Sequence, residues 1–492
     1  MLPIPPGTPA CRAKVILIGL DSADRRLVEQ WCDSGDLPFL RSLRERGAFG
    51  HLTGFPAMGD DATWASFYTA VSPGRHGRYF WNYQEEGTYE RRPWRDRAVS
   101  MQPFWRHLSQ SGLRIAVTDV PKCPLVTGLN GVQVADWHVH GRDYEETCSW
   151  PPQLAQDLLR RFGDDRTDRV DQDWLCRLHS LRDQELEVFE QHLLHGLEQK
   201  TRFACELLER ENWDLFLIVF KEAHCIGHQG WRLLDQSVKR IYQALDQSVG
   251  NIARALRPET SCIVFSDLGM GPNYTGEHLL DELLQRLESK ISTPCQRAIL
   301  AARRAQRKLH ALLERHGKPV RAPADRLAFQ VEHNEISGAI RINLVGREPA
   351  GIVLPGAEYK HYCDSLSKEL LALRIPETGQ PLVEKVLSAD DAYPGERRDE
   401  LPDLFVVWTR QRLITGAQSQ SIGTLHCLPP DYRSGNHTEG GFYLGVGPRV
   451  LPGRHHSAPA SIMDLAPTVA ALLNASLPGV EGTPIPELCQ RC

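Results

Sequence analysis

The sequence predicts an α/β fold in which helices flank a central, mostly parallel β-sheet. Three runs indicate the sheet, because each is apolar or β-branched without the alternation of a half-exposed strand. They are residues 14–20 (KVILIGL), 213–220 (WDLFLIVF) and 261–266 (SCIVFS). Long polar segments with helical character separate them, notably residues 150–212 and 233–256, as expected where helices connect parallel strands.

Length and composition exclude several classes of protein. At 492 residues, one large domain with insertions or two domains is expected. The net charge of −5, without a large basic block, argues against binding to nucleic-acid polymers but leaves small anionic substrates open. No run resembles a membrane span or the apolar core of a signal peptide, and the 13 cysteines show no paired spacing. We therefore expect a cytoplasmic protein with reduced thiols, whose oligomeric state stays open.

The first predicted strand ends at Asp21 and follows a Pro-rich leader at residues 1–13. A carboxylate at the end of a parallel strand is held at the edge where ligand crevices of α/β sheets open. Asp21 is therefore a candidate metal ligand. Asp and Ser are also the usual helix N-cap residues, so Ser22 or Asp24 could cap the helix that follows.

The strand at 213–220 leads directly into two histidines, His224 and His228. On a helix, residues four apart lie on one face about one turn apart, a spacing that suits a single metal ion. The alternative is two ordinary histidines on an amphipathic helix. Other strand-like runs of the chain also end in candidate ligands, which favours the metal site.

A series of motifs extends over most of the chain. It comprises GLD at 19–21, LPFLRSLRERGAFG at 37–50, WASFYTAVSPGRHG at 64–77, SDLGMGPN at 266–273, IRINLVGREPAGIV at 340–353, PDLFVVW at 402–408, NHTEGGFYLGVGP at 436–448 and MDLAPTVAALLNASLP at 463–478. In this order the motifs resemble the alkaline phosphatase superfamily, in particular its type I phosphodiesterase/nucleotide pyrophosphatase branch.

The resemblance implies an alkaline phosphatase-like three-layer fold with a helical insert and a small subdomain. The expected units are a core at 14–276 and 401–492, a helical insert or cap at 277–330 and an α+β subdomain at 331–400. The implied function is metal-dependent hydrolysis of a small phosphate ester, with sulfate esters also open. Because the sequence departs from the family at functional positions, two alternatives remain: a phosphoryl-group transferase of a biosynthetic pathway, and a non-catalytic binding protein of the same fold.

The family's nucleophile, a Thr or Ser at the start of a helix, corresponds to Asp60 in this alignment. Asp60 could attack to form an acyl phosphate, or could hold a metal ion and a water. Thr63 would supply the ordinary alkoxide if the alignment is shifted, and Asp61 is a further candidate that we group with substrate binding. The alternative is that Gly59, Asp60 and Asp61 only cap the helix.

The resemblance also implies two metal positions. The first takes an Asp and a His four apart plus a late His, which gives His224, His228 and His437, with a His replacing the Asp. Three neutral imidazoles are a well-known catalytic zinc set with an open position for water or phosphate. We therefore expect at least one divalent ion, with Zn favoured.

The second metal position would take Asp21, Asp267 and, less directly, Asp60. The family has a histidine after the aspartate, but this chain has Leu268, so one ligand is missing. An oxygen-rich set suits Mg or Mn, or a weakly held Zn. A second ion and a one-metal enzyme are both open.

Four further residues are candidates for contact with substrate. His138 and His140 project on the same side if the segment at 131–143 is extended. Asn343 and Arg347 lie in and next to a turn of the smaller subdomain, where Arg347 is equally suited to brace the turn.

Overall fold

The computed structural model describes residues 13–94, 97, 101–138, 146–163, 180–254, 257–313, 323–333, 336–430, 433–453 and 458–489. No helix within these ranges is both long enough and apolar enough to cross a membrane.

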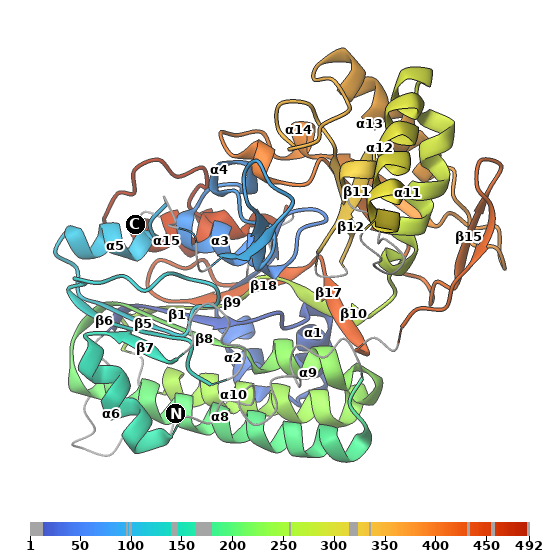
Figure 1. Cartoon of the computed structure of the whole chain (residues 1–492). Helices are drawn as coiled ribbons and strands as arrows, with labels where there is room; N and C mark the ends of the chain where they lie inside the picture. Colours follow the sequence, from blue (N-terminus) through green and yellow to red (C-terminus); the bar gives the residue numbers. More distant parts are fainter. Residues whose placement is uncertain are drawn as a thin grey trace.

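A nine-stranded sheet forms the centre of the molecule (Figure 1), with the strand order β19-β2-β18-β9-β1-β8-β5-β6-β7. Its strands are β1 (Ala13–Leu20), β2 (Ala48–Thr53), β5 (Ile115–Thr118), β6 (Gly131–Ala135), β7 (Cys148–Trp150), β8 (Trp213–Phe220), β9 (Ser261–Ser266), β18 (Gly441–Val446) and β19 (Ala460–Ser461). The run β9-β1-β8-β5-β6 is parallel, while β18 and β7 are antiparallel to β9 and β6. The predicted, mostly parallel sheet is confirmed, and the three predicted strands are its centre.

The central strands end in register. Leu20 of β1 pairs with Phe220 of β8, and Gly19 pairs with Phe265 of β9. Because these strands are parallel, the residues that follow them meet at one edge of the sheet. Asp21, the start of the next helix after β8, and Asp267 are therefore neighbours in space.

Helices cover both faces of the sheet (Figure 1). One face carries α1 (Arg25–Ser34), α2 (Pro38–Arg46), α6 (Pro152–Phe162), α8 (Asp183–Arg210), α9 (Glu222–Gly230) and α10 (Lys239–Ala253); the other carries α3 (Asp60–Thr69), α4 (Pro73–His76), α5 (Phe104–Gln110) and α15 (Leu465–Leu472). Strand β1 shows why two cores form. Ile16 and Ile18 pack into one apolar cluster and Val15 and Leu17 into the other, because alternate side chains point to opposite faces.

A second, antiparallel sheet with the order β11-β12-β14-β13 lies beside the large one (Figure 1). Its strands are β11 (Ala328–Val331), β12 (Gly338–Ile342), β13 (Val383–Ser388) and β14 (Leu404–Trp408), and its helices are α11 (Glu277–Ile291), α12 (Pro294–Leu313), α13 (Ala357–Leu371) and α14 (Ala389–Ala392). Leu283 of α11, Ile340 of β12, Leu366 of α13 and Val406 of β14 share one apolar core.

The predicted division of this region differs from the observed packing in two places. The helical segment expected as a separate insert at 277–330 shares its core with the small sheet. Strand β14, which the boundary at residue 401 assigns to the large core, pairs with β12 and β13. The domain boundaries themselves stay a prediction.

Three short ribbons complete the structure. They are β3 (Asn82–Gln84) with β4 (Arg91–Pro93), β10 (Gly269–Pro272) with β17 (Gly435–Thr438), and β15 (Gly416–Ser419) with β16 (Gly423–His426). The β10–β17 ribbon positions a residue of the site described below.

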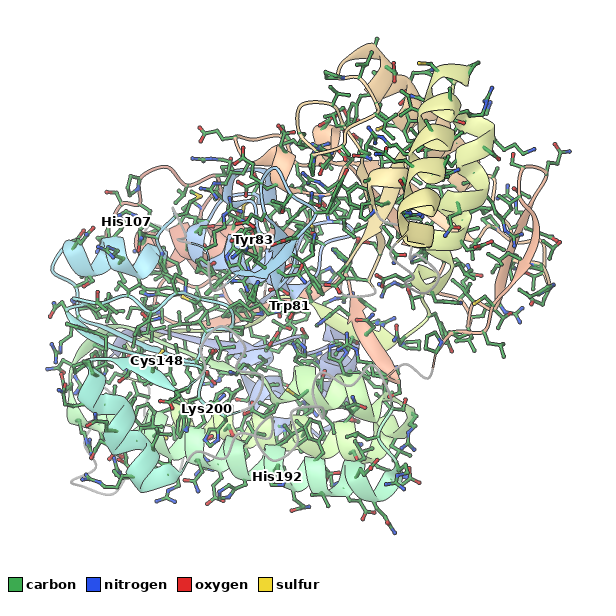
Figure 2. The ribbon with its side chains drawn as sticks, in the orientation of Figure 1. Trp81, Tyr83, His107, Cys148, His192 and Lys200 are labelled. Atoms are coloured by element: carbon green, nitrogen blue, oxygen red, sulfur yellow. The ribbon has the colours of Figure 1, made fainter. Side chains whose placement is uncertain are left out.

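Four buried charged side chains connect the helix layer to the sheet. Lys200 of α8 lies on the side of the sheet that α8 and α10 cover (Figure 2). Its Nζ donates to Asp119 Oδ2 at 2.7 Å and lies 3.5 Å from Glu222 Oε1. Lys221 Nζ donates to the other oxygen of Asp119 at 3.0 Å. Two positive and two negative groups meet here away from water, and Glu222 is the first residue of α9.

Replacing Lys200 by methionine is expected to lower the free energy of unfolding by about 3–5 kcal/mol, because Asp119 and Glu222 lose a buried positive partner. Urea unfolding followed by circular dichroism measures the loss. Lys360→Met is the control, because the Lys360 side chain is 77% exposed on α13 and should contribute less than about 0.5 kcal/mol. Equal losses in the two variants would contradict a special role for the buried lysine.

Candidate metal centre

Three buried histidines converge at the carboxyl edge of the large sheet. His224 and His228 lie on α9, directly after β8, and His437 lies on β17. Their ring centroids are 4.7 to 4.8 Å apart. Within the described ranges, they are the one group of three or more His, Cys, Asp or Glu residues whose ligand atoms all lie within 4.8 Å of one another.

His437 reaches this cluster through strand pairing. It lies in β17, where it pairs with Met270 of β10 shortly after Asp267. Two glycines permit the close approach of α9. A Cβ on Gly435 would lie 2.1 Å from the carbonyl oxygen of Gly227, and a Cβ on Gly227 would lie 2.8 Å from the Met270 side chain.

Each of the three imidazoles has a hydrogen-bond partner at Nδ1. The pairs are His224 Nδ1 with Asp21 Oδ2 at 3.1 Å, His228 Nδ1 with the Gly435 carbonyl at 2.9 Å, and His437 Nδ1 with Ser22 Oγ at 3.1 Å. A proton on each Nδ1 leaves the lone pair on Nε2, which is the usual arrangement of metal-binding histidines. The Nε2 atoms of His224 and His228 lie 3.1 Å apart. With both protons on Nδ1, the two Nε2 lone pairs lie close enough for one cation to bind both.

Burial favours the neutral form of His228 and His437. It lowers the pKa of His437 to about 3, although the negative charge of Asp60 acts in the opposite direction. The pKa of His228 is also well below its usual range, first because of burial and then because of Arg433 and the neighbouring imidazoles. Neutral imidazole is the form that binds a metal ion, so burial prepares these two rings to act as ligands. The three histidines together are grouped closely enough to hold one divalent cation.

Asp21 is ionised and orients His224. Burial acts to raise the pKa of Asp21, but the interaction with His224 outweighs it, and the pKa lies below its usual value. Its second oxygen, Oδ1, accepts hydrogen bonds from Trp64 Nε1 and Ser22 Oγ, both at 3.1 Å. Both oxygens of Asp21 therefore have donors, as expected of a carboxylate that supports a metal-binding histidine.

The predicted second metal position is less complete. Asp267 Oδ1 accepts the backbone N–H of Ser22 at 2.8 Å, whereas its buried Oδ2 has no hydrogen-bond partner within the described part of the chain. Burial, reinforced by the charge of Asp21, raises the pKa of Asp267 well above its usual range. Leu268 is buried against Gly54 and offers no ligand atom. As far as the structure describes the chain, Asp21, Asp60 and Asp267 form no group as compact as the three histidines.

Asp60, and not Thr63, lies beside the histidines. Helix α3 begins at Asp60, whose Oδ1 lies 3.8 Å from His437 Nε2 and whose Oδ2 lies 3.8 Å from His224 Nδ1. The buried hydroxyl of Thr63 donates to the carbonyl of Gly59 at 3.0 Å. Of the two candidates at this helix start, Asp60 is thus the one whose side chain has a recorded contact with the histidines.

Two basic residues that the sequence analysis did not identify surround the aspartates. Lys122 Nζ bonds to Asp60 Oδ2 and, at 3.1 Å, to Asp61 Oδ2. Arg78 donates to Asp61 Oδ1 through Nε and Nη2 at 3.2 and 2.9 Å. Burial acts to lower the pKa of Lys122, but the two carboxylates outweigh it and raise the pKa. Asp61, expected to bind substrate, is thus engaged in buried ion pairs.

The segment that carries the predicted His138 and His140 is not extended as far as His138. Strand β6 ends at Ala135, and His138 has a φ of 62°, so the extended geometry does not reach it. The His138 ring is buried with its centroid 4.2 Å from that of Trp137. His140 lies outside the described residues.

Asn343 and Arg347 belong to hydrogen-bond networks of the small sheet. Asn343 Nδ2 donates to the carbonyls of Pro323 and Arg326, and its Oδ1 accepts from Tyr89. Arg347 makes a two-point contact with Asp403 at 2.8 and 2.6 Å and a further bond to Glu348 at 2.9 Å. Arg347 therefore braces the turn, the second of its two expected roles.

Known proteins resemble this chain in sequence and in structure. The family model described as type I phosphodiesterase / nucleotide pyrophosphatase matches residues 15–437. Phosphonoacetate hydrolase from Sinorhizobium meliloti 1021, in complex with phosphonoformate, has a TM-score of 0.54 at 14% identity, over 95% of this chain and 97% of that chain.

Murine ectonucleotide pyrophosphatase/phosphodiesterase 5 has a TM-score of 0.51 at 11% identity, over 95% of this chain and 97% of that chain. Identities this low show a shared fold alone. No curated protein matches the sequence.

Proposed function

Because the chain belongs to the type I phosphodiesterase/nucleotide pyrophosphatase family, we propose that it hydrolyses a phosphate ester with a divalent metal ion held by His224, His228 and His437. Family membership places the chain among phosphoric ester hydrolases. The observation that supports the metal is the common arrangement of the three rings, each with a hydrogen-bond partner at Nδ1 and with Nε2 left to bind. Zinc is the ion that a set of three imidazoles favours.

The residues around the histidines have distinct roles in this proposal. When bound, the metal ion would supply Lewis acidity to a phosphoryl oxygen. Asp21 and Ser22 hold two of the rings in the orientation that binding needs. Asp60 attacks the phosphorus: a bond forms between its carboxylate oxygen and phosphorus, the bond from phosphorus to the ester oxygen breaks, and the alkoxide takes a proton from water and leaves as the alcohol. A water molecule then breaks the acyl phosphate bond, which releases the phosphate product and restores the carboxylate.

The substrate class follows from the family and from the charges of the centre. The cation, with Lys122 and Arg78 nearby, suits a small anionic ester, and we propose a phosphodiester or phosphomonoester. A sulfate ester presents the same tetrahedral oxyanion and is the next class to test. We also propose that the enzyme acts in the cytoplasm, because its cysteines show no paired spacing.

Removing the metal is expected to reduce hydrolysis of an aryl phosphodiester, such as bis(4-nitrophenyl) phosphate, by about 10²-fold or more, since Lewis-acid stabilisation is worth several kcal/mol. The protein is dialysed against a chelator, its metal content is measured by mass spectrometry, and activity is followed while Zn, Mn or Mg is restored. The control is the same chelator saturated with calcium beforehand. Full turnover by folded protein without bound metal would refute the proposal.

A further inference from the structure

We propose that the ammonium group of Lys122 takes the place of a second metal ion, so that the centre works with one divalent cation and one fixed ammonium. This inference rests on the proposed function, since it specifies how that centre balances charge. It concerns a residue that the sequence motifs do not mark and that the structure places against Asp60.

Lys122 is held in place from both its backbone and its side chain. It lies in the loop between β5 and β6 with a φ of 58°, and its carbonyl accepts a hydrogen bond from Arg78 Nη1 at 2.8 Å. The side chain is only 9% exposed, and its Nζ lies between the carboxylates of Asp60 and Asp61. An ammonium fixed in this way is a permanent part of the centre and not a mobile surface charge.

The ligands that a second ion would need are missing or already engaged. Leu268 stands where the resemblance calls for a histidine. Both oxygens of Asp21 are engaged in hydrogen bonds, Oδ2 with His224 and Oδ1 with Trp64 and Ser22. Asp60 Oδ2 is bonded to Lys122. Asp267 Oδ2 has no hydrogen-bond partner among the described residues, and a single carboxylate oxygen does not hold a divalent ion against water.

The charges around Asp60 also argue against a second metal ion. Asp60 and Asp61 carry two negative charges, and Lys122 and Arg78 carry two positive charges, so this half of the centre is balanced without a metal. A divalent ion bound to Asp60 would lie next to the ammonium. In a buried site, where the dielectric constant is low, such like charges repel strongly.

The ammonium can also perform the electrostatic task of the ion it replaces. Fixed cationic donors stabilise the negative charge that develops on a transferring phosphoryl group. Lys122 bonds to the same carboxylate that we assign to the attack, so its charge lies beside the phosphoryl oxygens once the phosphorus reaches Asp60. The histidine-bound ion alone then supplies Lewis acidity.

Metal stoichiometry tests this inference without relying on activity. Wild-type protein equilibrated with zinc and freed of excess ion is expected to retain one ion per chain, measured by mass spectrometry. The double variant Lys122→Ala/Leu268→His removes the ammonium and supplies the missing imidazole, and it is expected to retain two. The matched single variant Leu268→His keeps the ammonium and is expected to stay at one.

Each other outcome is decisive. Wild type that retains no ion would refute the proposed function itself. Wild type that retains two ions would overturn the role of Lys122 while leaving the proposed function standing. Two ions in Leu268→His alone would show that the ammonium does not exclude the second ion. One ion in the double variant, with a circular dichroism spectrum like that of wild type, would also overturn the inference.

Discussion

Replacing His228 by alanine is expected to remove the metal and to reduce turnover by about 10²- to 10⁴-fold, as the loss of several kcal/mol of charge stabilisation implies. His228 is anchored through Nδ1 to the carbonyl of Gly435, and its Nε2 lies 3.1 Å from that of His224. The two remaining imidazoles cannot bind the ion as tightly as three. Without His228 the protein therefore binds the cation less tightly and no longer holds it in a fixed position.

The measurement pairs metal content with kcat/KM across a zinc titration. His195→Ala is the matched control, because it removes an exposed histidine from α8, distant in sequence from the motifs of the centre. It should leave both quantities at the wild-type level. A His228→Ala protein that keeps its ion and its turnover would show that the three histidines do not act as a metal centre.

Asp60→Ala is expected to lower kcat by about 10³-fold or more at equal metal occupancy, because it removes the attacking group. Thr63→Ala is expected to change kcat by only a few fold. The Thr63 hydroxyl bonds to the carbonyl of Gly59 one turn back, so its loss costs about 1 kcal/mol of stability. Asp61 still pairs with Lys122 in the Asp60 variant, which keeps a negative partner for the buried ammonium.

The comparison is made by single-turnover kinetics on zinc-loaded protein. Asp60→Asn preserves shape and removes the nucleophilic carboxylate, so it should lose activity like the alanine variant. Loss of activity in Thr63→Ala, with Asp60→Ala still active, would mean that the alignment of the helix start is wrong.

The centre of the fold could be predicted because its signals are local. Strands β1, β8 and β9 are unbroken apolar runs, and parallel strands buried on both faces need that composition. His224 and His228 follow such a strand at helical spacing, so α9 could be expected as well. Their closeness to one another follows from a single helix and needs no tertiary information.

The rest of the centre depends on contacts between segments far apart in the sequence. His437 lies in the four-residue strand β17, which pairs with β10. The sequence GNHT has no pattern that predicts a strand, so this pairing could not be expected. Lys122 reaches Asp60 from a loop in which its own backbone has a positive φ. A loop conformation of this kind leaves no periodic pattern in the sequence, so the contact could not be predicted. Arg347 was a substrate candidate because the sequence does not show that Asp403, 56 residues later, forms an ion pair with it.

The β10–β17 ribbon connects the proposed metal site to the smaller sheet. The backbone carbonyl of His437 accepts a hydrogen bond from Arg410, which follows β14 and also donates to the carbonyl of Ile336 at 3.1 Å. The residue that carries the third imidazole is thus fastened by a side chain that follows a strand of the smaller sheet. We therefore expect local unfolding of that sheet to release His437 and to weaken metal binding at the proposed site.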